Sequence, residues 1–197
     1  MSLPIFHSLA GYSIYRLSRS SQEEQDWKLA LYCILLANAA DFDFVPGILL
    51  GNAARFHHGG MHSFGAAMIC GVIAGMVFGM WKKKFSSKVF LVSSCAYASH
   101  IVLDYFNDAH NGLPVFWPLS AVKLPVTLTV FQWAGRWEPL AGSGFGAFWD
   151  YLSNASRLEQ WGAEILFVSL ILLGFSAHAR FKKRISIKEP AFLLKKD

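Results

Sequence analysis

Residues 62–81, HSFGAAMICGVIAGMVFGMW, contain no Asp, Glu, Lys or Arg. An apolar run of about 20 residues is the length that an α-helix needs to cross the hydrocarbon core of a bilayer. The sequence holds four more apolar segments, two of similar length at 88–106 and 158–177 and two shorter ones at 3–17 and 27–44. We therefore expect an all-α fold, a polytopic membrane helix bundle with about five transmembrane helices, in which the two short helices span a thinned region or pack inside the bundle.

The composition supports a membrane protein. The chain is 54% hydrophobic and only 16% charged, whereas soluble domains carry about a quarter charged residues. We expect a single membrane-embedded domain over residues 1–184 and a basic tail over 185–197. Residues 107–157, rich in Trp, Pro and Gly, are expected to form an irregular aromatic-rich loop, for which a lid over a site and a plain interfacial loop are equally open interpretations.

The basic residues predict the orientation of the bundle. They cluster after segment 3–17, between segments 62–81 and 88–106, and after segment 158–177, and the only Lys and Arg residues elsewhere are Arg55, Lys123, Arg136 and Arg157. Because cytoplasmic loops carry the excess of Lys and Arg, the amino terminus is expected outside and the carboxyl terminus in the cytoplasm. The net charge of +5 is thus a topology signal, with contact to membrane lipids, and a nucleic-acid partner is not expected.

This topology brings histidines and aspartates together at the outer end of the bundle. His100 and Asp104 are four residues apart and share one helical face, Asp41 and Asp43 end the second segment, and glycines follow His57 and His58 just before His62. Each residue alone could be a core histidine, a helix cap or half of an intrahelical hydrogen bond. Their convergence instead predicts a divalent metal site with zinc favoured and manganese or iron(II) as alternatives, and the number of donors suggests two ions. The expected metal ligands are His7, Asp41, Asp43, His57, His62, His100 and Asp104.

Four stretches, FHSLAGYSIYR, AADFDFVPGILLG, RFHHGGMHSF and HIVLDYFNDAHNGLPVFWPLS, together resemble the motifs of the bacterial membrane-bound metal-dependent hydrolases, the YdjM-like family of the LexA-regulated type. The resemblance covers most of residues 1–122 and implies the same seven ligands. It also implies a multi-pass protein of the bacterial inner membrane whose active site faces the periplasm. His58 stands where the family often has arginine, so it is expected in the second shell or facing substrate.

The resulting hypothesis is a hydrolase that cleaves a phosphoester bond of a lipid or another amphiphilic substrate, such as a phospholipid or polyprenyl phosphate, through a metal-activated water. Its expected catalytic residues are Asp41, Asp104 and His58, with Asp41 or Asp104 bridging the metals or accepting the proton of the water. Ser63 is expected to support the site rather than to act as a nucleophile. Two alternatives stay open: a non-catalytic membrane protein with a structural metal, and a metal transporter or sensor.

Overall fold

The computed structural model describes residues 4–19, 25–52, 55–107 and 112–125, together with 162, 165–166 and 169–170. Within these ranges the structure is all-α, with one isolated antiparallel bridge between Leu113 and Leu124 and no strand. Of the expected helix at 158–177, the structure describes only residues 162, 165–166 and 169–170, all helical. The tail at 185–197 and most of the outer loop at 107–157 lie outside the described residues.

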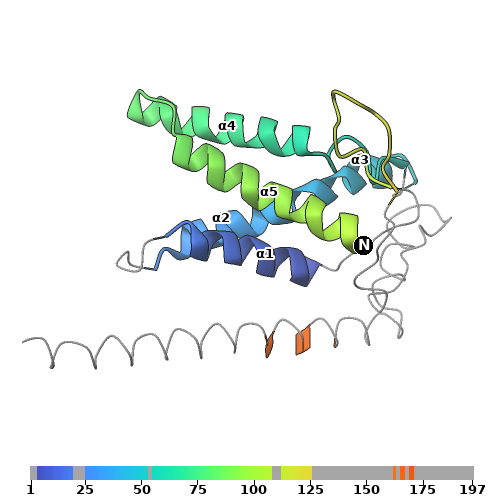
Figure 1. Ribbon diagram of the computed structural model, residues 1–197, viewed down its shortest axis with the longest axis horizontal. Coiled ribbons are helices and arrows are strands. Elements are labelled where there is room, and N and C mark those ends of the chain that lie inside the picture. The colour runs from blue at the N-terminus through green and yellow to red at the C-terminus, as the bar shows by residue number, and fades with distance from the viewer. Residues whose placement is uncertain are drawn as a thin grey trace, which may run out of the picture.

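Four helices form the bundle, and each falls on a predicted apolar segment. They are α1 (Pro4–Leu17), α2 (Trp27–Ala37), α4 (Phe64–Lys82) and α5 (Ser87–Asn107). Helix α5 is central, because it contacts α1, α2 and α4 (Figure 1). The helices alternate in direction, so the start of α1, the end of α2, the start of α4 and the end of α5 meet at the same end of the bundle (Figure 1).

One described helix, over Ser87–Phe106, is long and apolar enough to cross a membrane, and the bent pair Trp27–Ala37 with Ala39–Leu49 passes the same test when it is taken as one span. Phe64–Met80 is apolar but shorter. The described residues thus contain one or two such helices, and five crossings remain a prediction.

The second apolar segment does not end as the sequence suggested. The segment was predicted as one apolar stretch over 27–44, but α2 stops at Ala37, a 3₁₀ helix, η1 (Ala39–Asp43), follows, and α3 (Phe44–Leu49) contains Pro46. The break lies at Asn38, whose side-chain amide donates to the carbonyl of Ile34 at 2.8 Å and to the Ser8 hydroxyl at 3.2 Å. Proline is accommodated because the first turn of a helix needs no N–H donors. The chain bends by 51° at this break, and Asp41 and Asp43 lie on the turn that follows it.

Glycines spaced four residues apart on α4 face α5 and the turn that precedes it: Gly71 and Gly75 face Phe90 of α5, and Gly79 faces Lys84 and Phe85 in the turn. A Cβ atom at Gly71 would meet the Ser94 Oγ atom and lie 2.8 Å from the Phe90 carbonyl oxygen, and one at Gly75 would lie 2.7 Å from the Phe85 ring. Small residues at this spacing let helix backbones pack tightly in a membrane, where no hydrophobic effect drives helices together.

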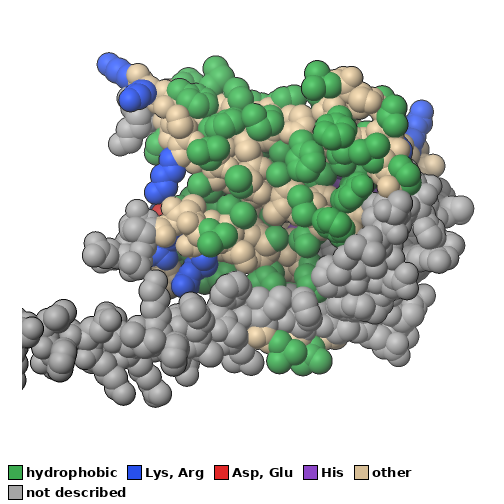
Figure 2. Space-filling view, viewed as in Figure 1, with side chains coloured by type: hydrophobic (Ala, Val, Ile, Leu, Met, Phe, Trp, Pro, Cys, Tyr) green, Lys and Arg blue, Asp and Glu red, His purple; other side chains and the backbone are tan. Residues whose placement is uncertain are grey.

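The outer surface of the bundle is apolar and its charges are segregated. Six large side chains of α4 are 40–58% exposed, namely Met68, Ile69, Val72, Ile73, Met76 and Val77. An apolar face of this extent marks a surface that contacts lipid or protein rather than water, and hydrophobic side chains cover the visible face of the bundle (Figure 2). Most blue side chains in Figure 2 lie at the end where α1 finishes and α2 begins, in agreement with Arg16 in the last turn of α1 and Lys28 at the start of α2.

Replacement of Gly71 by alanine tests the close approach of α4 and α5. In a helix without neighbours, Gly→Ala stabilises by about 1 kcal/mol. At Gly71 the added methyl group meets α5, so we expect Gly71→Ala to destabilise the fold by about 1–3 kcal/mol. Thermal unfolding in detergent measures the change.

Gly162→Ala is the matched control, because a Cβ atom at Gly162 would have nothing within 4 Å. An unfolding temperature for Gly71→Ala equal to or above that of the unmodified protein would contradict the packing described for α4 and α5.

Candidate metal centre

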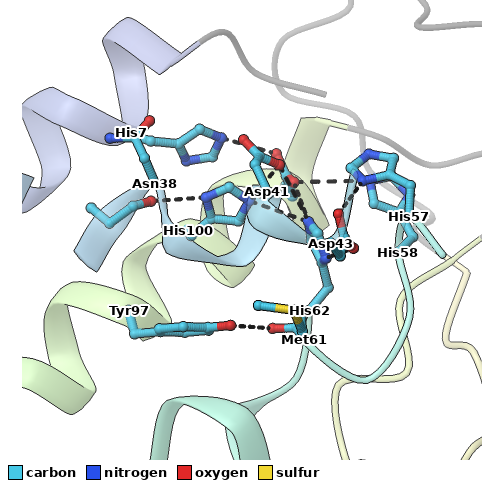
Figure 3. A network of polar contacts seen from close by, with 12 residues as sticks. His7, Asn38, Asp41, Asp43, His57, His58, Met61, His62, Tyr97 and His100 are labelled. Atoms are coloured by element: carbon cyan, nitrogen blue, oxygen red, sulfur yellow. Dashed lines mark hydrogen bonds and ion pairs between the residues drawn. The ribbon is translucent and has the colours of Figure 1, made fainter. Parts of the chain in front are cut away.

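Four side chains from three segments, namely η1, the loop before α4 and helix α5, converge at the end of the bundle where α4 begins (Figure 3). His100 Nε2 lies 3.2 Å from Asp104 Oδ2 and 3.4 Å from Asp41 Oδ1. His62 Nε2 lies 3.5 and 3.6 Å from the same two oxygens, and the two Nε2 atoms are 3.3 Å apart. All four donor atoms lie within 4.8 Å of one another. We call Asp41, His62, His100 and Asp104 the four-donor group.

These separations match those between the ligands of one metal ion. A tetrahedral site with metal–ligand bonds of about 2.0–2.1 Å has edges of about 3.3–3.4 Å, and the five measured edges span 3.2–3.6 Å. Two imidazoles and two carboxylates are donors that zinc, manganese and iron(II) accept. In both chemistry and spacing, the donors therefore fit a divalent metal.

Hydrogen-bond partners behind the two imidazoles aim their Nε2 atoms at the same point. His100 Nδ1 donates to the Ala37 carbonyl at 2.8 Å, which is available because α2 ends there and leaves its last carbonyls without helical partners. His62 Nδ1 lies 3.0 Å from Asp43 Oδ2. A proton on each Nδ1 atom leaves a lone pair on each Nε2 atom, the tautomer that binds metal. Two lone pairs only 3.3 Å apart repel unless a proton or a cation lies between them.

Asp43 lies behind this group rather than in it. One of its oxygens is 3.0 Å from His62 Nδ1, and the other accepts a hydrogen bond of 3.0 Å from His57 Nδ1. Its side chain caps no helix, although it occupies the cap position of α3. Asp43 was predicted as a ligand, and that role stays a prediction; in the structure its carboxylate contacts two histidines, an arrangement common around metal-bound imidazoles.

His7 and His57 also contact the group from outside. The His7 ring stacks on His100 with centroids 3.7 Å apart, and its Nε2 atom lies 3.3 Å from Asp104 Oδ1. The His57 ring stacks on Phe44 at 3.9 Å. All seven predicted ligands lie in this network. Five of them belong to groups of donors close enough to hold one ion, whereas His7 and Asp43 only contact members of those groups.

A second set of donors shares His62 with the first. His57, His58 and His62 offer ring nitrogens that lie within 4.8 Å of one another. His58, expected outside the ligand set, belongs to this set and also lies 3.9 Å from Asp104 Oδ2. His58 adopts a left-handed backbone conformation, with φ 57°. The chain turns at this residue, between His57 and the glycines that follow.

His58 and His62, two of the three histidines in the loop before α4, differ in charge. Burial, and then the nearby His57 and His62 rings, lowers the pKa of His58 to about 2, so its ring is neutral at pH 7. Burial also disfavours a charge on His62, but hydrogen bonds to Asp104, Asp41 and Asp43 outweigh it and raise the pKa of His62 well above 6.5. The carboxylates thus require a positive charge in their midst, and a proton on His62 and a divalent cation compete to supply it.

Packing contacts hold the loop that carries His62. Tyr97 on α5 donates its hydroxyl to the Met61 carbonyl at 3.0 Å (Figure 3). Ser63 donates to the Gly60 carbonyl at 2.6 Å and accepts from the Ala66 N–H at 3.0 Å, so it caps α4, in agreement with the expectation that it supports the site. Sequence reasoning missed Tyr97, Asn38 and the Ala37 carbonyl, because nothing in their local pattern marks them as partners of a distant histidine.

The four basic residues predicted near the outer end of the bundle, which could bind a phosphate group, are Arg55, Lys123, Arg136 and Arg157. Arg55 and Lys123 are exposed, and the Arg55 guanidinium lies over the Phe56 ring at 5.5 Å. Arg136 and Arg157 lie outside the described residues, as do Asp108 and His110, which the predicted topology also puts at the outer end.

Comparison with known proteins gives one match. The sequence model of a protein family described as YdjM inner membrane protein matches residues 1–182. No curated protein and no solved structure matches the chain.

The different positions of His62 and Asp43 predict different losses of metal. His62→Ala removes a donor, so we expect the purified protein to lose its metal. Asp43→Asn keeps all four donors and removes only the group that orients His62, so we expect metal affinity to fall by about 10–100-fold. Metal content by elemental analysis and competition with a chelator of known affinity measure both effects.

Met61→Ala is the control, because its side chain is 38% exposed beside His62 and its contact with Tyr97 is made by the backbone. Complete loss of metal in Asp43→Asn, equal to that in His62→Ala, would make Asp43 a ligand instead.

Proposed function

The chain belongs to the YdjM inner membrane protein family, and on that premise we propose that it is a membrane-embedded metal-dependent hydrolase that cleaves a phosphoester bond of a lipid or another amphiphilic substrate. The observation that carries the proposal is the four-donor group, whose two imidazoles and two carboxylates have the spacing of ligands around one ion. A divalent metal held there would lower the pKa of a water molecule and polarise a phosphoryl oxygen.

The exposure of the donors favours Asp41 as the catalytic carboxylate. The side chains of His62, His100 and Asp104 are completely buried, whereas that of Asp41 is 18% exposed. Water and substrate therefore approach from the Asp41 side, where its carboxylate accepts the proton of the attacking water. Asp104 contacts His7 with one oxygen and the donor group with the other, which suits a fixed ligand better than a base.

The neutral His58 ring suits a hydrogen-bonding role toward substrate. Its low pKa makes it a poor general acid, but a neutral imidazole can still donate one hydrogen bond to a phosphoryl oxygen. Arg55 and Lys123, both exposed, could bind the remaining charge of a phosphate group.

We further propose two ions, with zinc favoured and manganese or iron(II) as alternatives. The ring nitrogens of His57 and His58, which lie beside His62 in the second donor set, support a second ion next to the first. Two adjacent ions are common in enzymes that cleave phosphoesters.

A structural metal is the second candidate function, and one observation favours it. Four protein donors close the coordination sphere of zinc, as in structural sites, whereas catalytic sites keep a position for water. A transporter or sensor is less well supported, because the described parts of α1, α2, α4 and α5 contain no Asp, Glu or His between the metal centre and the basic end of the bundle.

The hydrolase proposal predicts metal-dependent cleavage. Zinc-loaded protein should release phosphate or head group from at least one member of a panel of phospholipids, polyprenyl phosphates and chromogenic phosphoesters. Removal of metal with a chelator should abolish the reaction and zinc should restore it. Asp41→Asn should reduce the rate by more than about 100-fold, since even outer partners of metal ligands are worth about 10–100-fold in activity.

Cys95→Ala, on the exposed surface of α5, is the control that should keep the activity of the unmodified protein. Two results together would support the structural metal instead: metal-replete protein that cleaves no member of the panel, and a His62→Ala variant that does not fold.

We also propose the predicted topology, with five crossings, the metal centre facing the periplasm and the carboxyl terminus in the cytoplasm. Arg16 lies in the last turn of α1, Lys28 in the first turn of α2 and Lys84 just after α4, at the end of the bundle opposite the four-donor group, and this segregation supports the proposed orientation. In intact cells, a membrane-impermeant maleimide should label Gly51→Cys, at an exposed turn near the metal centre, but not Lys84→Cys, when the three native cysteines are replaced by alanine. Labelling of both positions from the same side would contradict the orientation.

A further inference from the structure

Residues 112–125 form a loop that is closed by its own hydrogen bonds. Leu113 and Leu124 pair in both directions, with N–O distances of 3.3 and 3.0 Å. Inside the loop, the Trp117 N–H donates to the Pro114 carbonyl at 2.9 Å and the Ser120 N–H to the Phe116 carbonyl at 3.1 Å. We call residues 116–122, between these closing contacts, the loop tip.

The loop tip lies against the side of α4. A Cβ atom at Gly65 would meet the Trp117 carbonyl and lie 2.7 Å from Pro118 Cδ, and one at Gly60 would lie 3.0 Å from the Trp117 indole. The Phe64 N–H also donates to the Val115 carbonyl at 2.9 Å. In Figure 1 the yellow loop stands beside the first turns of α4. The tip is thus fixed at the level of the first turns of an apolar helix.

The tip exposes its apolar side chains. Leu119 is 93% exposed, Val122 65%, Phe116 55% and Trp117 39%. The segment over 112–125 contains no Asp or Glu, and its one charged residue, Lys123, follows the tip. Next to it, Met68 and Ile69 on α4 are 50% and 48% exposed, so the apolar surface of the tip continues that of the helix.

We propose that the loop tip is immersed in the lipid leaflet nearest the metal centre, with Phe116 and Leu119 among the acyl chains and Trp117 at the level of the head groups. If the tip lay in water, its four large apolar side chains would remain exposed to solvent, which is unfavourable. Lipid that covers the adjoining apolar face of α4 would cover the tip as well. Tryptophan favours the interface, and Lys123 is placed to meet anionic head groups. Lipid is the occupant that suits both this composition and the continuity with α4.

Immersion of the tip would place the metal centre at head-group depth. The same backbone that carries the tip is hydrogen-bonded to Phe64, two residues from His62, so the depth of the tip fixes the depth of His62. This consequence deepens the proposed function, on which it rests, because phosphate groups of amphiphiles lie at that depth. The immersion itself does not depend on hydrolysis and is tested without it.

Depth-dependent quenching of a probe attached at Leu119 tests the proposal. Leu119→Cys, in a full-length protein whose three native cysteines are alanine, is labelled with an environment-sensitive fluorophore and reconstituted into vesicles of phosphatidylethanolamine and phosphatidylglycerol. Met68→Cys on α4 and Lys84→Cys at the basic end are labelled in parallel. Quenching is measured with nitroxide-bearing lipids and with aqueous iodide.

We expect nitroxide lipids to quench the probe at Leu119 to within about a factor of two of the probe at Met68, and iodide not to quench it. The probe at Lys84 should be quenched by iodide and not by nitroxide lipids. Iodide quenching at Leu119 equal to that at Lys84 would place the tip in water and overturn the proposal. Protection from both quenchers would also overturn it, because protein rather than lipid would then cover the tip. Failed hydrolysis assays would leave the quenching result unchanged.

Discussion

The crowding of buried imidazole and carboxylate groups at one end of the bundle is the constraint that the rest of the fold has to meet. His62 and His100 present Nε2 atoms 3.3 Å apart, with carboxylate oxygens of Asp41 and Asp104 on either side. Such groups are costly to bury unless a positive charge lies among them. The same negative charge holds a proton on His62 and would also favour a divalent metal at this position.

The rest of the bundle keeps these donors in place. The break at Asn38 ends α2 where its Ala37 carbonyl can orient His100, and it sets Asp41 and Asp43 on a turn that faces the loop before α4. The glycines of α4 allow close contact with α5, and the Tyr97 hydroxyl ties the His62 loop to that helix. Features that weaken an isolated helix, a break and a run of glycines, here serve to position the metal centre.

The positions of the four bundle helices could be predicted from apolar runs bounded by charges, because lipid-facing helices must be apolar along their length. The convergence of His and Asp residues at one end followed from the placement of Lys and Arg alone. The break at Asn38 could not be predicted, since it depends on hydrogen bonds to Ile34 and Ser8. That Asp41 lies in the four-donor group while Asp43 lies behind it could not be predicted either, because it depends on which face of a 3₁₀ turn meets His62.

The position of the donors along the chain has a consequence for how the protein is made. Every donor of both sets lies between residues 41 and 104, and His7, which packs against them, comes earlier still. A ribosome that has released residue 107 has therefore already supplied all of these groups, with nearly half of the 197 residues yet to be synthesised. These described donors can therefore come together during insertion into the membrane, before the later part of the chain is made.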